Sequence, residues 1–128
     1  MENIPANQES AFNRIDQCAE RARLRHITGG IGQALVYQEK AEQAVDYITA
    51  GYPSDLSSYP YLQAEAAATG KDSVQIADDV LTHRSVWIRT CAEIEYERLR
   101  GKKAIREATD IESITTSRDT AIAALDAL

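Results

Sequence analysis

This chain of 128 residues has few cysteines and histidines, the residues that most often bind metals or form disulfides, and few large aromatic residues besides tyrosine. It has two cysteines, two histidines, one tryptophan and one phenylalanine. Cys18 and Cys91 lie far apart and neither belongs to a CxxC motif, so we expect two reduced core thiols rather than a disulfide framework. His26 and His83 have no further histidine or cysteine at ligand spacing on the same helical face. The sequence therefore predicts neither a bound metal nor a disulfide scaffold.

The chain also lacks long apolar runs and an excess of positive charge. No run approaches the ~20 apolar residues of a membrane span, and the first ten residues do not have the regions of a signal peptide. The formal net charge is −6, which would repel nucleic acid unless the basic residues gathered on one face. We therefore expect no membrane and no nucleic-acid partner, and a protein that stays in the cytoplasm or leaves it with a particle.

Alternation of apolar and polar residues, the pattern of a β-strand, does not persist for more than a few positions. Hydrophobic residues make up 44% of the chain, but alanine dominates them and aromatics are only 6%. Alanine buries little area, so the core should be thin and helices should pack closely, often with a partner that completes the core. The sequence predicts an all-α fold, a helical hairpin packed on a long helix in an elongated bundle.

Proline and glycine divide the chain, which is short enough for a single domain over residues 1–128. The turn Thr28-Gly29-Gly30 should separate the two helices of the hairpin. The predicted segments are a flexible arm at 1–7, the helical hairpin at 8–50, a loop at 51–60, a short helix followed by the long helix at 60–108, and a C-terminal helical segment at 109–128.

The long helix is the most regular part of the pattern. Apolar residues recur at steps of three and four from Ala77 to Ala108, and Arg84, Arg98 and Gly101 fall on the same stripe. An unbroken helix over 73–108 would be about 54 Å long, so we expect an elongated bundle or a break near Gly101. Its apolar seam, with Trp87, should face the hairpin.

No group of residues predicts a reaction. The glycine-rich stretch at 28–32 lacks the lysine and the preceding strand of a phosphate-binding loop. The carboxylates Asp78 and Asp79 diverge around a helix, and those of Glu93, Glu95 and Glu97 lie beside arginines, as on a solvated face. The serines have no GxSxG context. We predict no catalytic residue, no cofactor and no enzymatic activity.

Contacts with other proteins are a better explanation of the remaining features. Tyr52, Tyr59 and Tyr61 cluster in and beside the proline-containing loop, and tyrosine is enriched in interfaces. These tyrosines either form a docking patch or anchor the loop to the core. The apolar end at Leu125 and Leu128 either folds back on the bundle or docks on a neighbour. These five residues are the predicted partner-binding positions.

Several blocks of the sequence resemble small proteins from the tail-fibre or baseplate region of tailed bacteriophages, or C-terminal helical segments of such fibre proteins. The blocks are RHITGGIGQ from Arg25 to Gln33, YPYLQAEAAATG from Tyr59 to Gly70, and AEIEYERLRGKKAI from Ala92 to Ile105. Shorter matches include Ile15-Asp16 and Trp87. The resemblance covers about residues 13–108 and carries no catalytic signature.

The resemblance implies a structural virion protein, an adaptor that joins or caps tail fibres or the baseplate through protein–protein contacts. Its partners would be other tail proteins, with several copies of the chain in one assembly. An alternative is a tail-fibre assembly chaperone that is not retained in the virion. A third hypothesis is a small acidic regulator that binds a host protein.

Overall fold

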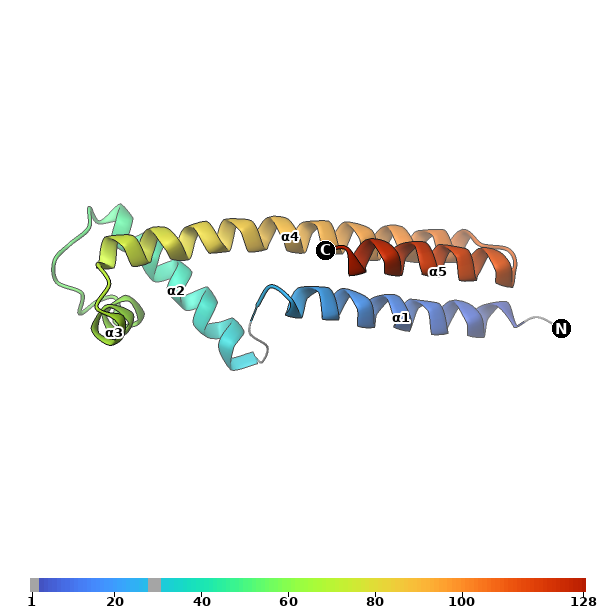
Figure 1. Ribbon diagram of the computed structural model, residues 1–128, viewed down its shortest axis with the longest axis horizontal. Helices are drawn as coiled ribbons and strands as arrows, with labels where there is room; N and C mark the ends of the chain where they lie inside the picture. Colours follow the sequence, from blue (N-terminus) through green and yellow to red (C-terminus); the bar gives the residue numbers. More distant parts are fainter. Residues whose placement is uncertain (1–2, 28–30) are drawn as a thin grey trace. The chain divides into compact units, whose positions relative to one another are not determined.

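The computed structural model describes residues 3–27 and 31–128, which form five helices and contain no strand (Figure 1). The all-α prediction is therefore confirmed for the described residues. The predicted glycine turn at 28–30 lies outside them. The helices are α1 (Ile4–Leu24), α2 (Ile31–Thr49), α3 (Pro60–Thr69), α4 (Ser73–Glu107) and α5 (Ile111–Asp126).

Capping residues explain where several helices begin. The Asn3 side chain accepts a hydrogen bond from the backbone nitrogen of Ala6, and Asp110 does the same for Ser113 at the start of α5. Both satisfy a backbone N–H that has no partner inside the helix. Because Asn3 caps α1, the helix starts at Ile4, and the expected arm at 1–7 is wrong for residues 4–7.

The chain divides into two compact units. Unit 1 comprises residues 1–27 and 89–128, and unit 2 comprises residues 28–88. The boundary falls inside α4, so the two parts of this helix contribute to different cores. The hairpin expected from the first two helices is not one of the units, because α1 belongs to unit 1 and α2 to unit 2.

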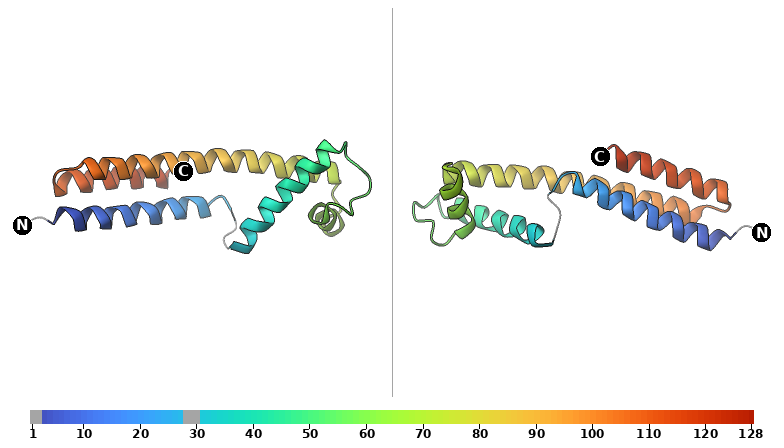
Figure 2. Two further views of the ribbon diagram at one scale, coloured as in Figure 1. Left: turned by 180° about the vertical axis from the view of Figure 1, so that it is seen from behind. Right: turned by 60° about the horizontal axis from the view of Figure 1, so that its bottom comes forward.

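Unit 1 is a three-helix bundle of α1, the second half of α4 and α5, which run side by side in the views of Figures 1 and 2. The core residues from α1 are small apart from Ile15, and those from the other two helices are large apart from Ala121. The buried members are Ala11, Ile15, Cys18, Ala19, Ala22, Ile94, Ile105, Ile114, Ala121 and Leu125.

Gly101 explains how closely these helices pack. A Cβ atom at this position would lie 2.6 Å from the Cβ of Ala121 and 3.0 Å from Cδ1 of Ile15. Glycine is therefore required by the close approach of α5 to α4, and α4 continues without a break to Glu107. The break considered near Gly101 does not occur, because packing of the bundle compensates for the weak helix propensity of glycine.

Unit 2 contains α2, α3 and the first half of α4, around a smaller core of Ala44, Tyr47, Leu62, Ile76 and Ala77. The backbone nitrogen of Tyr61, in the first turn of α3, donates to Oε1 of the buried Gln43 at 2.9 Å. Lys40 on α2 pairs with Glu65 on α3 at 2.8 Å. These polar contacts fix α3 against α2.

The apolar seam expected along α4 is thus shared by two cores. Ala77 is buried and Val80 packs in unit 2, whereas Ile94 is buried in unit 1. Trp87 and Cys91, between them, are half-buried and belong to neither core cluster. The prediction that this seam faces one hairpin is wrong, because a helix of 35 residues is longer than either core.

Candidate interaction surfaces

The loop tyrosines pack around a buried tyrosine of α2. Tyr47 is 2% exposed, and its ring makes edge-to-face contacts with Tyr52 and Tyr59 at centroid distances of 5.6 and 5.4 Å. Such contacts contribute about 0.5–1.5 kcal/mol beyond the buried area. Tyr59 is half-buried, whereas Tyr52 and Tyr61 are exposed. The sequence left open whether these tyrosines form a docking patch or anchor the loop to the core. Tyr59 anchors the loop, and Tyr52 also contacts Tyr47 but keeps part of its surface exposed.

The backbone of this loop turns sharply at Gly51 and Tyr52, which have φ angles of +84° and +59°. Residues other than glycine rarely adopt the left-handed backbone conformation. A residue that precedes a proline ordinarily adopts extended geometry, and Tyr52, which precedes Pro53, departs from that rule. The backbone nitrogen of Tyr52 donates to the carbonyl oxygen of Tyr47 at 3.1 Å, and this bond and the ring contact hold the unusual conformation. Tyr59, which precedes Pro60, has φ −127° and ψ 67° and so lies outside the helical region.

The apolar C-terminal residues fold back on the bundle. Leu125 is fully buried in the core of unit 1, and Leu128 packs against that core. The backbone carbonyl of Leu125 accepts a hydrogen bond of 2.7 Å from the Arg25 guanidinium, and Nε2 of His26 lies 2.6 Å from the backbone oxygen of Leu128. The last turn of α5 is therefore held by the end of α1, and the Leu125 side chain is not presented to solvent.

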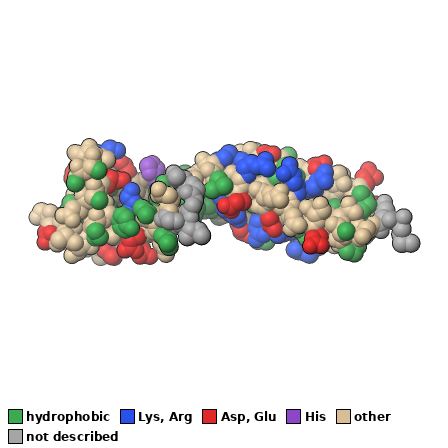
Figure 3. All heavy atoms as spheres, turned by 90° about the horizontal axis from the view of Figure 1, so that it is seen from below, with side chains coloured by type: hydrophobic (Ala, Val, Ile, Leu, Met, Phe, Trp, Pro, Cys, Tyr) green, Lys and Arg blue, Asp and Glu red, His purple; other side chains and the backbone are tan. Residues whose placement is uncertain are grey.

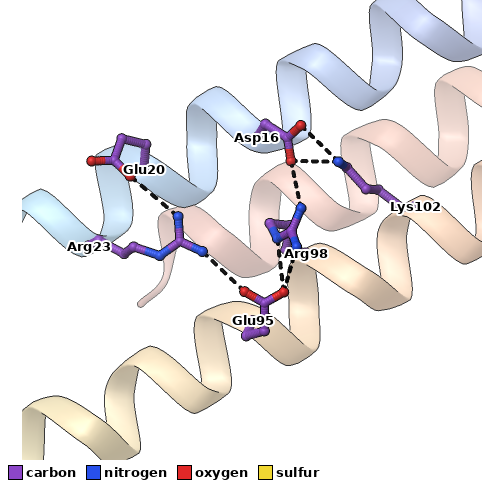
Figure 4. Close-up of polar contacts among 6 residues, drawn as sticks. All are labelled: Asp16, Glu20, Arg23, Glu95, Arg98 and Lys102. Carbon is purple, nitrogen blue, oxygen red and sulfur yellow. Dashed lines mark hydrogen bonds and ion pairs between the residues drawn. The ribbon is translucent and has the colours of Figure 1, made fainter.

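An ion-pair network joins α1 to α4 in unit 1 (Figure 4). Asp16 on α1 contacts two cations of α4, Arg98 at 3.0 Å and Lys102 at 2.8 Å. Arg98 also pairs with Glu95 at 2.6 Å, and Glu95 accepts from Arg23 of α1 at 3.2 Å. The Arg98 guanidinium thus bridges carboxylates from both helices. Figure 3 shows acidic and basic side chains interspersed over one face of this unit.

The network shifts the ionisation of its members. Partial burial alone would raise the pKa of Asp16, but hydrogen bonds from Lys102 and Arg98, together with their charges, hold that pKa below its ordinary value. The hydrogen bond from Arg98 likewise lowers the pKa of Glu95, although burial opposes the shift. The hydrogen bonds that Arg98 donates to Glu95 and Asp16 raise the Arg98 pKa. All three groups are charged near neutral pH, as a structural clamp requires.

Sequence reasoning missed this network, because its members are separated by about 80 positions along the chain. The detectable signal was Arg98, which interrupts the apolar stripe of α4 and should therefore meet a carboxylate on a neighbouring helix. Arg84, the other arginine on that stripe, is exposed. The stripe alone does not distinguish these two environments.

Residues that could carry chemistry are dispersed. Among the described residues, no group of three or more histidine, cysteine, aspartate or glutamate side chains is arranged to hold a metal ion. His83, Asp78 and Glu93 are exposed. Burial raises the pKa of the Cys91 thiol, against the opposing charge of Arg23.

A shallow polar groove lies between α1 and α5. It is lined by Ala6, Glu9, Ser10, Asn13, Arg14, Gln17 and Arg118. Its Arg118 side chain pairs with Asp119 at 2.9 Å. The groove is open to solvent and has little apolar lining, unlike the enclosed apolar pockets that hold small ligands.

Large apolar side chains are exposed on several helices. Among the described residues, ten are exposed, whereas the buried core holds eight apolar side chains larger than cysteine together with alanines and Cys18. Single exposed apolar residues are normal on a protein surface, whereas apolar side chains that lie together on it mark sites of contact with other molecules. The exposed residues are Leu24, Leu35, Tyr37, Val45, Tyr52, Tyr61, Val86, Ile88, Tyr96 and Leu99.

No protein-family model, curated protein or solved structure matches this chain. Within the described residues, no helix combines the length and the apolar character needed to cross a membrane. The functional interpretation therefore rests on the surfaces of the molecule and on the sequence itself.

Proposed function

We propose that this protein is a helical adaptor that acts through protein–protein contacts as a structural component of a tailed-bacteriophage virion. The observation that carries the adaptor role is the exposure of ten large apolar side chains among the described residues, four of which lie on α4. The location in the tail, at the fibre or baseplate, rests on the sequence resemblance to small proteins of that region. In this role the chain works in several copies beside other tail proteins, is made in the host cytoplasm and leaves with the particle.

The ion-pair clamp suits an adaptor because it fixes the helices that present the contact residues. Asp16, Arg98 and Glu95 form ion pairs that restrain α4 relative to α1 before a partner binds. A rigid surface loses less conformational entropy on association than a flexible one. In the proposed role, the residues of the ion-pair clamp position the helices, and the exposed apolar residues contact the partner.

Mass spectrometry of purified particles tests this proposal. A virion component is expected in fixed stoichiometry with known tail proteins, after washing at high salt. Its absence from intact particles, with recovery only in complexes with free fibre, would instead identify the alternative assembly chaperone. Absence from both would exclude both roles.

A further inference from the structure

The outer face of α4 in unit 1 has a charge pattern that is complementary to itself in the reverse direction. The residues of this face follow one another at alternating steps of four and three, so they form a single stripe on the helix. All of them are exposed, whereas Ile94, Gly101 and Ile105 on the opposite side are buried. The stripe, called the outer α4 stripe below, consists of Arg89, Glu93, Tyr96, Arg100, Lys103 and Glu107.

We infer that the outer α4 stripe binds the same stripe of a second copy of this chain, with the two helices antiparallel. A two-fold axis at the level of position 98 makes residues that are equally distant from it face each other across the contact. Arg89 then meets Glu107 of the second copy, Glu93 meets Lys103, and Tyr96 meets Arg100. Two of these pairs join opposite charges, and the third joins a cation to an aromatic ring. By symmetry each pair occurs twice.

Most side chains of the stripe are available for these contacts, although Arg100 forms a close ion pair with Glu97 of its own helix. Lys103 and Glu107 are 71% and 67% exposed and lie 3.8 Å apart in a loose pair along the helix. Arg89 and Glu93 have no ion-pair partner among residues 3–27 and 31–128. A weak pair on one helix is readily exchanged for pairs across an interface, since exposed pairs contribute only ~0.2–1 kcal/mol.

Apolar area at the centre of the stripe supplies the attraction. Tyr96 is 61% exposed, and Leu99, beside it on the same side of α4, is 49% exposed. The Arg100 guanidinium carbon already lies 5.5 Å from the Tyr96 ring centroid, so the stacking geometry exists within one copy. Parallel pairing would instead place each charged residue beside the identical residue of the second copy, so that like charges would meet.

The contact deepens the proposed function, because it supplies a way for copies of the adaptor to associate with each other. It does not depend on a location in the tail. With two large apolar side chains per copy, the interface belongs to the small, transient class. We therefore expect a dimer with a dissociation constant of ~10–100 μM.

Sedimentation equilibrium of the purified full chain tests the inference. The average mass is expected to rise with concentration from 14.1 kDa toward twice that value. Glu93→Lys and Lys103→Glu each place two like-charged pairs in the homodimer and should weaken association at least about tenfold. An equimolar mixture of the two variants should recover wild-type association, because in the heterodimer both pairs have opposite charges again.

Two controls separate this effect from net charge and from unfolding. Glu42→Lys on α2 and the exposed Lys71→Glu make the same charge changes outside the stripe and should leave association unchanged. All four variants alter exposed side chains, so their melting curves by circular dichroism should match that of the wild type.

A wild-type chain that stays monomeric up to ~1 mM would overturn the inference and leave the stripe to a different protein. A dimer that both stripe variants leave intact would place the interface elsewhere. Loss of association in each variant without recovery in the mixture would refute the antiparallel register. The particle measurement of the proposed function is independent of these outcomes, so either proposal can fail alone.

Discussion

Replacing Gly101 by alanine should destabilise unit 1, although the same change stabilises most helices. In a helix exposed to solvent, alanine is favoured over glycine by about 1 kcal/mol. At position 101 the added methyl group would lie 2.6 Å from the Cβ of Ala121 and 3.0 Å from Cδ1 of Ile15. The Ile15 side chain can rotate away from the methyl group. The Ala121 Cβ cannot, because it is fixed to the backbone of α5.

The magnitude follows from the two opposing effects. Ordinary van der Waals contact begins near 3.4 Å, so α5 must move outward by several tenths of an ångström or more. Overpacking of this kind costs typically ~1–3 kcal/mol, and the displaced helix also loses dispersion contacts along the core. After subtraction of the gain in helix propensity, we expect Gly101→Ala to lower the free energy of unfolding by ~1–2 kcal/mol.

Urea denaturation followed by circular dichroism measures this change, and a second variant identifies its cause. Ala121→Gly removes the opposing methyl group, so the double variant moves the methyl from α5 to α4. The double variant should be more stable than the sum of the single changes predicts, with a coupling energy of at least about 1 kcal/mol. Ala92→Gly, at an exposed site of α4, reports the helix-propensity effect alone.

If Gly101→Ala is as stable as the wild type or more stable, the close approach of α4 and α5 does not limit the packing of unit 1. Strictly additive effects in the double variant would mean that the methyl groups at positions 101 and 121 do not meet.

Three further predictions concern the clamp, the core and the loop. Because the Asp16 pKa is lowered below its ordinary value of 3.8 in the folded protein, the unfolded chain takes up this proton first as the pH falls. The stabilisation is therefore complete at neutral pH and is lost as the pH falls through the folded pKa. Asp16→Asn should cost up to ~1 kcal/mol at neutral pH, since the carboxylate is partly exposed, and much less near pH 2, as measured by urea denaturation at both pH values. An equal cost at both would contradict a role of the charge. Leu125→Ala should cost ~2–5 kcal/mol in the same assay, because this side chain fills the core of unit 1; a loss below ~1 kcal/mol would mean that the side chain is not enclosed. At Tyr52, where φ is +59°, glycine should be more stable than alanine by ~1 kcal/mol in thermal melts, since both remove the ring but only glycine tolerates the backbone. Equal stability of the two variants would argue against the left-handed conformation.

Much of the fold could be predicted because helix formation and helix ends depend on local sequence. Apolar residues at steps of three and four identified α1, α2 and α4, and Pro60 and Gly70 marked the ends of α3. The first turn of α1 was missed, since capping by Asn3 involves a single side-chain contact that the arm's polar composition obscured.

The partners of each helix were harder to predict because they depend on contacts between distant residues. The stripe on α4 predicted one buried face, yet Ala77 and Ile94 on that face belong to different cores. Of the candidate contact residues, Tyr52 and Tyr61 are exposed, whereas Tyr59 and Leu125 pack inward. Tyrosine and leucine occur both in cores and in interfaces, so the sequence could not separate these cases.

The sequence by itself determined that this protein is all-helical, with a thin alanine-rich core, because periodicity and composition act within a few turns of the chain. It also predicted a solvated charged face around Glu93, a residue of the outer α4 stripe that is exposed in the structure. Only the tertiary structure decided that Gly101 marks a close helix contact rather than a break. Only the tertiary structure decided that Asp16 clamps Arg98 and Lys102. Both features depend on contacts between residues about 20 to 85 positions apart in the sequence. Local sequence preferences do not specify such contacts.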